Sequence, residues 1–145
     1  MASDFEMFWE NDSFAVVGHS TDKPFPVLTY RGLQQLGKTV FAVDPTIEEI
    51  DGERTFPEFG YLPRRVDAVV LEVPKKETRD WVDRAARAGI RNVWIHMGTE
   101  TPEALALASE RGLNVRSGTC AVMYVTPRFT YHSLHRWAMK LAGRY

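Results

Sequence analysis

The chain has 145 residues, 44% of them hydrophobic and 26% charged, and a chain of this length buries roughly 70% of its extended surface in one domain without disulfides or a structural metal. Its net charge of −1 excludes a general attraction to nucleic acid or to an anionic membrane. The single cysteine, Cys120, excludes a disulfide framework, and no segment approaches the roughly 18 consecutive apolar residues of a membrane helix. Residues 1–12 lack the pattern of a signal peptide, so we expect a cytoplasmic protein.

The first elements in chain order are a short helix and a series of buried strands. Ser3 and Glu6 have the spacing of a capping box, which predicts a helix with the nearby aromatic side chains on one face. Apolar runs then recur 21 to 28 residues apart, as in successive βα units. Within these runs polar residues do not alternate with apolar ones, so the runs predict strands that are covered on both faces. The runs are 14–18, 39–43, 67–73 and 93–97, and a weaker fifth begins at Asn114.

Helix patterns lie between the runs, each with apolar residues at helical spacing and a glycine after the last of them. These helices end at Gly37, Gly89 and Gly112, and Thr101 caps the third ahead of Pro102. The link 45–66 is irregular, and 131–141 has the pattern of an amphipathic terminal helix.

Together these elements predict a single α/β domain over residues 1–145. We expect a Rossmann-like, doubly wound sheet of about five parallel strands, with extra N- and C-terminal helices. Numbered along the chain, the strands are expected in the order 3-2-1-4-5. The terminal helices are expected to pack on the body of the domain or on a second subunit, so a homodimer stays open.

Small or polar residues follow all five predicted strands. Ligands of an open parallel sheet bind outside the carboxyl ends of its strands, where the strand order reverses. Strand ends need turn residues in any protein, so each segment alone says little, but all five together favour a binding site. The candidate residues are Gly18, His19, Ser20, Thr21, Lys23, Asp44, Pro45, Val73, Pro74, Met97, Gly98, Thr99, Thr119 and Cys120.

The loop after the first strand carries most of this interpretation. Gly18 allows a tight exit from the strand, free N–H groups at the next helix start can hold a phosphate, and Lys23 can add a positive charge. We therefore expect Gly18→Val to leave a folded protein that no longer admits the phosphate. The loop lacks the GxGxxG fingerprint, but Asp44 lies where a dinucleotide enzyme keeps its ribose-binding acid. This keeps NAD open as a ligand, although Asp44 also suits a simple Asp-Pro turn.

An enzymatic site can be drawn from the polar residues at the strand ends. His19 and His96 follow strands that neighbour one another in the expected order, and Glu72 and Cys120 end other strands. No HxxxH or CxxC spacing supports a metal, and Cys120 suits a small buried side chain. We therefore predict no catalytic or metal-binding residue. The basic ridge at His132, Arg136, Lys140 and Arg144 is interpreted as a solvated face and not as a nucleic-acid site.

The order of these segments resembles the small stand-alone CoA-binding domain proteins. The resemblance rests on 14–20 (FAVVGHS), 43–45 (VDP), 93–98 (VWIHMG) and the late Cys120, and it covers about residues 12–126. Such proteins are similar to the N-terminal CoA-binding domain of the succinyl-CoA synthetase α subunit. The resemblance implies that CoA or an acyl-CoA binds at the first loop, Pro45, Val73-Pro74, Gly98-Thr99 and the segment ending in Cys120.

The resemblance implies a carrier, sensor or regulatory module without ligase chemistry, since the synthetase's phosphorylated histidine lies in a separate domain. Two positions depart from the family pattern. Asp44-Pro45 stands where many members have Asn-Pro, and an acid there would repel a nearby phosphate. Glu72-Val73-Pro74 stands where many have Phe-Arg, although the Val-Pro pair matches the synthetase-like pattern. The alternative is a small NAD-dependent oxidoreductase or other enzyme that uses the same crevice.

Overall fold

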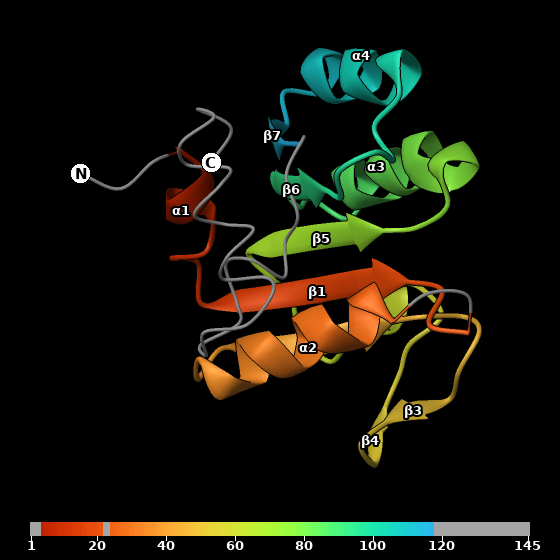
Figure 1. The fold of residues 1–145 in the computed structure, drawn as a ribbon. Coiled ribbons are helices and arrows are strands. Elements are labelled where there is room, and N and C mark those ends of the chain that lie inside the picture. The colour runs from red at the N-terminus through yellow and green to blue at the C-terminus, as the bar shows by residue number, and fades with distance from the viewer. Residues whose placement is uncertain (1–3, 22–23, 118–145) are drawn as a thin grey trace.

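The computed structural model describes residues 4–21 and 24–117, and its centre is a sheet of five parallel strands with helices on both sides (Figure 1). This confirms the predicted Rossmann-like α/β fold and the short helix near the N-terminus, while the helix predicted at 131–141 lies outside the described residues. The strands are β1 (Ser13–Gly18), β2 (Thr39–Val43), β5 (Ala68–Glu72), β6 (Asn92–Ile95) and β7 (Asn114–Arg116). The helices are α1 (Asp4–Phe8), α2 (Phe25–Gln35), α3 (Thr78–Arg87) and α4 (Pro102–Glu110). The irregular links contain a hairpin of β3 (Glu49–Ile50) and β4 (Glu53–Arg54) and two 3-10 turns, η1 (Phe59–Tyr61) and η2 (Lys75–Glu77).

The strands follow the order β2-β1-β5-β6-β7, so the third main strand along the chain pairs with the first. The expected order, which put the second strand between them, is wrong. The outer edge of β2 is occupied by the segment that follows it. The backbone of Phe56 donates to the carbonyl of Ala42 at 2.9 Å and accepts from the N–H of Asp44 at 2.9 Å. Because this edge is covered, β5 pairs with the other side of β1.

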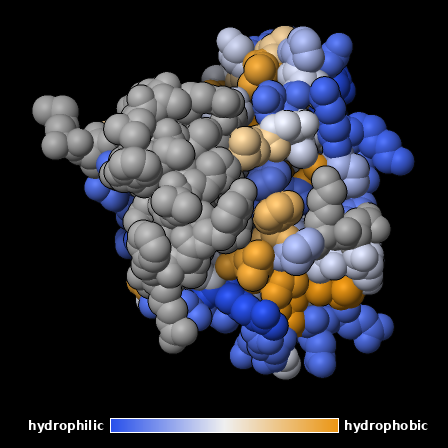
Figure 2. All heavy atoms as spheres, viewed as in Figure 1, coloured by the Kyte–Doolittle hydropathy of each residue, from blue (hydrophilic) through white to orange (hydrophobic). Residues whose placement is uncertain are grey.

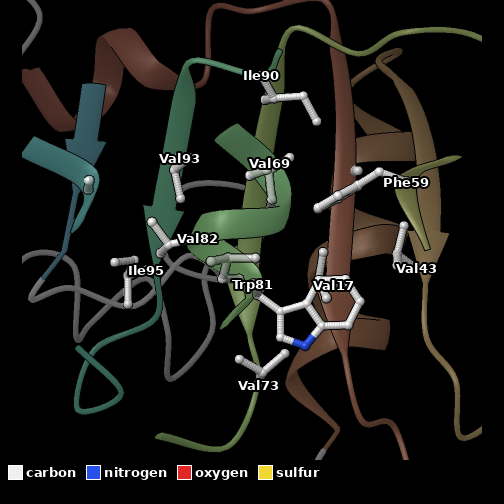
Figure 3. Packing of buried hydrophobic residues seen from close by; sticks show 14 of the residues in the cluster. Val17, Val43, Phe59, Val69, Val73, Trp81, Val82, Ile90, Val93 and Ile95 are labelled. Atoms are coloured by element: carbon white, nitrogen blue, oxygen red, sulfur yellow. The ribbon is translucent and has the colours of Figure 1, made fainter. Parts of the chain in front are cut away.

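Each face of the sheet is covered by a different pair of helices. Val17, Val69 and Ile95 belong to the cluster that packs against α3 and α4, and Figure 3 shows these side chains around Trp81 and Val82 of α3. On the opposite face, Val16 and Trp94 pack with residues of α1 and α2. Alternate residues of each central strand therefore enter different halves of the core, as a doubly wound sheet requires.

The outer surface offers few large apolar side chains. In Figure 2 apolar residues gather over α2, and Leu28 and Leu36 of this helix are exposed. Among the described residues, no helix has the length and apolar character of a membrane span.

The carboxyl end of β1 is fixed by very close packing against the first turn of α2. A Cβ atom at Gly18 would lie 2.1 and 2.5 Å from two carbons of the Pro26 ring, closer than atoms can approach. The φ angle of Gly18 is not positive, so glycine is needed here for space and not for backbone conformation. The expectation that Gly18→Val leaves a folded protein stays a prediction, but the packing gives the substitution a cost, because a side chain here would push α2 away from the sheet.

We predict that Gly18→Ala lowers the free energy of unfolding by about 1–3 kcal/mol, the usual cost of overpacking a tight contact. Thermal unfolding measures the loss, at roughly 2–4 °C per kcal/mol for a chain of this size. Gly60→Ala is the matched control, because a Cβ at Gly60 meets no atom within 4 Å. Equal melting temperatures for the two variants would show that α2 shifts without cost.

Candidate functional site

The strand order reverses between β1 and β5. From β1 the chain passes through α2 to β2 on one side, and from β5 it passes through α3 to β6 on the other. Gly18 and Glu72 pair at the end of these two strands, so residues 19–21 and 73–77 flank the switch point where open parallel sheets bind ligands. Figure 1 shows the ends of β1 and β5 at the same edge of the molecule.

The described candidate residues all follow strands that end at this edge. Gly18, Asp44, Val73 and Thr99 are buried, while Thr21, Pro45 and Gly98 are exposed. His19, Ser20, Pro74 and Met97 are half-buried. Lys23, Thr119 and Cys120 lie outside the described residues.

Asp44 fastens the loop after β1 to the loop after β2. The residue is 3% exposed, and its Oδ2 accepts a hydrogen bond from the Ser20 N–H at 2.8 Å. Oδ1 accepts from the Thr46 N–H at 2.8 Å and from the Thr46 hydroxyl at 2.5 Å. Both oxygens are engaged within the protein, which weighs against Asp44 as the acid that binds the ribose of NAD.

These contacts also leave the backbone with few donors for a phosphate. The N–H of Ser20 already serves Asp44. At the start of α2, Pro24 and Pro26 have no N–H, and the N–H of Leu28 bonds to the carbonyl of Pro24. Of the four donors that a helix start normally leaves free, two are therefore missing. The helix start expected to hold a phosphate is weaker than the sequence pattern indicates.

A second side-chain contact crosses the switch point. His19 Nε2 lies 3.1 Å from Glu77 Oε1, and Glu77 ends the η2 turn that follows β5. Asp44 thus holds the loop after β1 from one side, and Glu77 meets it from the other.

Glu72 is a second buried acid at this edge. Its side chain is 1% exposed, and Oε2 lies 3.6 Å from His96 Nδ1. Burial raises the pKa of Glu72 to about 8, an effect that the neighbouring Thr29 side chain partly opposes. The imidazole of His96 in turn lies against the ring of Phe25, with the ring centroids 4.9 Å apart. At neutral pH Glu72 is therefore mostly protonated and adds little negative charge to the site.

The two histidines that the sequence suggested for one acid–base site belong to two separate pairs. His19 meets Glu77, His96 meets Glu72, and β5 lies between β1 and β6. The expectation that the two histidines follow neighbouring strands is therefore wrong. No group of three or more potential ligands for a metal occurs within residues 4–21 and 24–117.

One cavity adjoins the candidate site. It has a volume of about 490 Å³ and lies between the end of β2 and the hairpin, with Pro45, Glu49 and Arg54 in its wall. Sequence patterns missed this hairpin as part of the edge, because its strands have two residues each. A cavity of similar size along α3, between Glu58 and Arg87, is built from the helix flank and not from the strand ends.

Comparison with known proteins gives one family and several similar folds. The chain matches the sequence model of the CoA-binding domain family over residues 12–126, and no curated protein matches it in sequence. A hypothetical protein from Pyrococcus horikoshii OT3 is 27% identical, with a TM-score of 0.74 over 83% of this chain and 85% of that one. A conserved hypothetical protein from Pyrococcus furiosus is also 27% identical, with a TM-score of 0.69 over 76% and 96%.

The fold also occurs as part of a much larger enzyme. A dinucleotide-forming acetyl-coenzyme A synthetase 1 from Ca. Korarchaeum cryptofilum is 24% identical, with a TM-score of 0.62. The alignment covers 77% of this chain but 27% of the synthetase chain.

We predict that the Glu72→Gln variant loses a pH dependence that the wild type has. The carboxyl has an ordinary pKa of 4.5 and a folded pKa of about 8, so between these values the folded chain binds more protons than the unfolded one. Wild-type stability therefore falls as pH rises through this window, by up to about 1.4 kcal/mol per pH unit. Melting temperatures from pH 5 to 9 would measure it, with the exposed Glu103→Gln as control; parallel profiles for wild type and Glu72→Gln would contradict the prediction.

We also predict that Asp44→Ala destabilises the protein by about 1–3 kcal/mol, because the partly buried N–H of Ser20 loses its acceptor. Asp44→Asn keeps one acceptor oxygen and should lose less. Urea unfolding would measure both variants, with the exposed Asp67→Ala as control. An Asp44→Ala variant as stable as the control would show that solvent replaces these hydrogen bonds.

Proposed function

The chain belongs to the CoA-binding domain family, and on that premise we propose that it binds coenzyme A or an acyl-CoA at the switch point between β1 and β5. The observation that carries the proposal is the family match over residues 12–126, which spans all the strands that meet at this edge. The ligand would contact the loop after β1, Pro45, Val73-Pro74, Gly98-Thr99 and the segment ending in Cys120.

The geometry of the described residues supports this proposal. In the loop after β1, Ser20 is held by Asp44 and His19 meets Glu77, so these two residues need little ordering when a ligand binds. Pro74 is half-buried and Gly98 is exposed, which offers an apolar contact and close backbone approach. Glu72 is mostly protonated at neutral pH, so this buried acid at the switch point repels an anionic ligand little.

We further propose that the protein acts as a carrier, sensor or regulatory module and not as a ligase. Each of the two imidazoles near the switch point lies against an acidic side chain, Glu77 or Glu72, which accounts for their positions without a substrate. NAD is the weaker ligand, because both oxygens of Asp44 are engaged and the glycine fingerprint is missing. Cytoplasmic location and assembly as a homodimer stay predictions.

We predict that CoA stabilises the native protein. At free ligand near 100 times Kd, binding adds about 2.7 kcal/mol to the free energy of unfolding, which appears as a rise of several degrees in melting temperature. Thermal shift with CoA, acetyl-CoA and NAD at millimolar concentration is the measurement, and mass spectrometry of ligand released from freshly purified protein identifies what is carried. A shift with NAD and none with either coenzyme A species would replace this function by the dinucleotide alternative.

A further inference from the structure

Coenzyme A carries a diphosphate and a 3′-phosphate, so a site for it must compensate several negative charges. The described loops that follow β1, β2, β5 and β6 contain only two lysines or arginines, Lys75 and Lys76 of η2. The other charged groups of these loops are mainly acidic, and the backbone offers little in exchange. Ser20 has given its N–H to Asp44, and the start of α2 has prolines at two of its four donor positions.

The turn that carries the two lysines is held at the switch point. The Glu77 N–H bonds to the carbonyl of Pro74 at 2.8 Å, which closes the turn. The Glu77 carboxylate then lies 3.1 Å from His19 in the loop after β1. The backbone of Lys75 and Lys76 is therefore fixed opposite that loop, three and four residues beyond the end of β5.

Both lysines are exposed, and neither has an acidic partner within the part of the chain that the structure describes. Other cations belong to the neighbouring elements, and the exposed Arg79 lies in the first turn of α3, directly after the lysine turn. Arg54 lines the cavity beside the end of β2 and lies 5.8 Å from the ring of Phe56. Arg84 of α3 contacts Glu58 and Asp80. Lys75 and Lys76 thus provide free positive charge beside the crevice, which the fold itself does not use.

We propose that Lys75 and Lys76 form the phosphate-binding element of the site and that they bind the phosphates of coenzyme A. This inference rests on the proposed function and names the part of the site that recognises the charged end of the ligand. Sequence patterns did not single out these residues, because two lysines in a loop look like any solvated surface. Only the β1–β5 pairing brings them to the switch point.

Isothermal calorimetry with CoA and dephospho-CoA tests the proposal on the wild type and on the double variant Lys75→Gln, Lys76→Gln. We expect the double variant to bind CoA about tenfold more weakly at low salt, since each exposed charge contact changes affinity severalfold. Wild-type affinity should also fall more steeply than that of the double variant as NaCl rises from about 0.05 to 0.5 M. Lys38→Gln is the matched control, because Lys38 precedes β2 at the opposite edge of the sheet.

The possible results distinguish the phosphate-binding role of the two lysines from CoA binding itself. Loss of affinity for CoA alone assigns the lysines to the 3′-phosphate, and equal loss for dephospho-CoA assigns them to the diphosphate. Unchanged CoA affinity in the double variant, or the same loss in Lys38→Gln, overturns the phosphate-binding role while leaving CoA binding intact. A wild type that binds neither compound overturns the proposed function itself. Melting temperatures of the free variants should match the wild type, as expected for exposed side chains.

Discussion

β1 and β5 pair along their length, from Phe14 opposite Ala68 to Gly18 opposite Glu72, and this pairing determines which two loops meet at the switch point. It brings the turn that follows β5 against the loop that follows β1, so that Glu77 reaches His19. The pairing of β5 with β6 places the Glu72 carboxyl beside His96, directly after β6. With any strand between β1 and β5, the contact of His19 with Glu77 would not form and the reversal of strand order would lie elsewhere.

Asp44 and Glu72 both lie at this edge, and a different feature of the structure limits how strongly each of them repels an anionic ligand. Asp44 is surrounded by three hydrogen-bond donors from Ser20 and Thr46, which stabilise its charge and use it to fasten two loops. Glu72 has no such set of donors, and burial keeps it mostly protonated at neutral pH. The departure from the Asn-Pro pattern at Asp44 thus has a structural reason, because a carboxylate accepts at both oxygens where an amide accepts at one.

The elements of the fold could be predicted because they depend on local patterns. Runs such as 14–18 are apolar without alternation, and the structure buries them on both faces. The strand order depends instead on Phe56 covering the edge of β2, 13 residues after that strand ends, and no local pattern encodes it. Likewise Gly18 predicted the end of β1. That a side chain is excluded at this position depends on where the Pro26 ring lies, which the sequence does not indicate. Side-chain pairs such as His19 and Glu77, which lie 58 positions apart, have no sequence signal at all.

The prolines at the start of α2 link the packing of the fold to the chemistry of the site. Pro26 packs against Gly18 and holds α2 tightly on β1, yet proline at this position removes a backbone donor from the place where many nucleotide-binding folds hold a phosphate. Pro24 removes a second one. A chain that gains close packing in this way has to obtain positive charge from side chains instead. Side chains on an exposed turn are screened by salt far more than buried backbone donors are. The same prolines that fix the fold therefore make ionic strength a natural measure of how this site recognises its ligand.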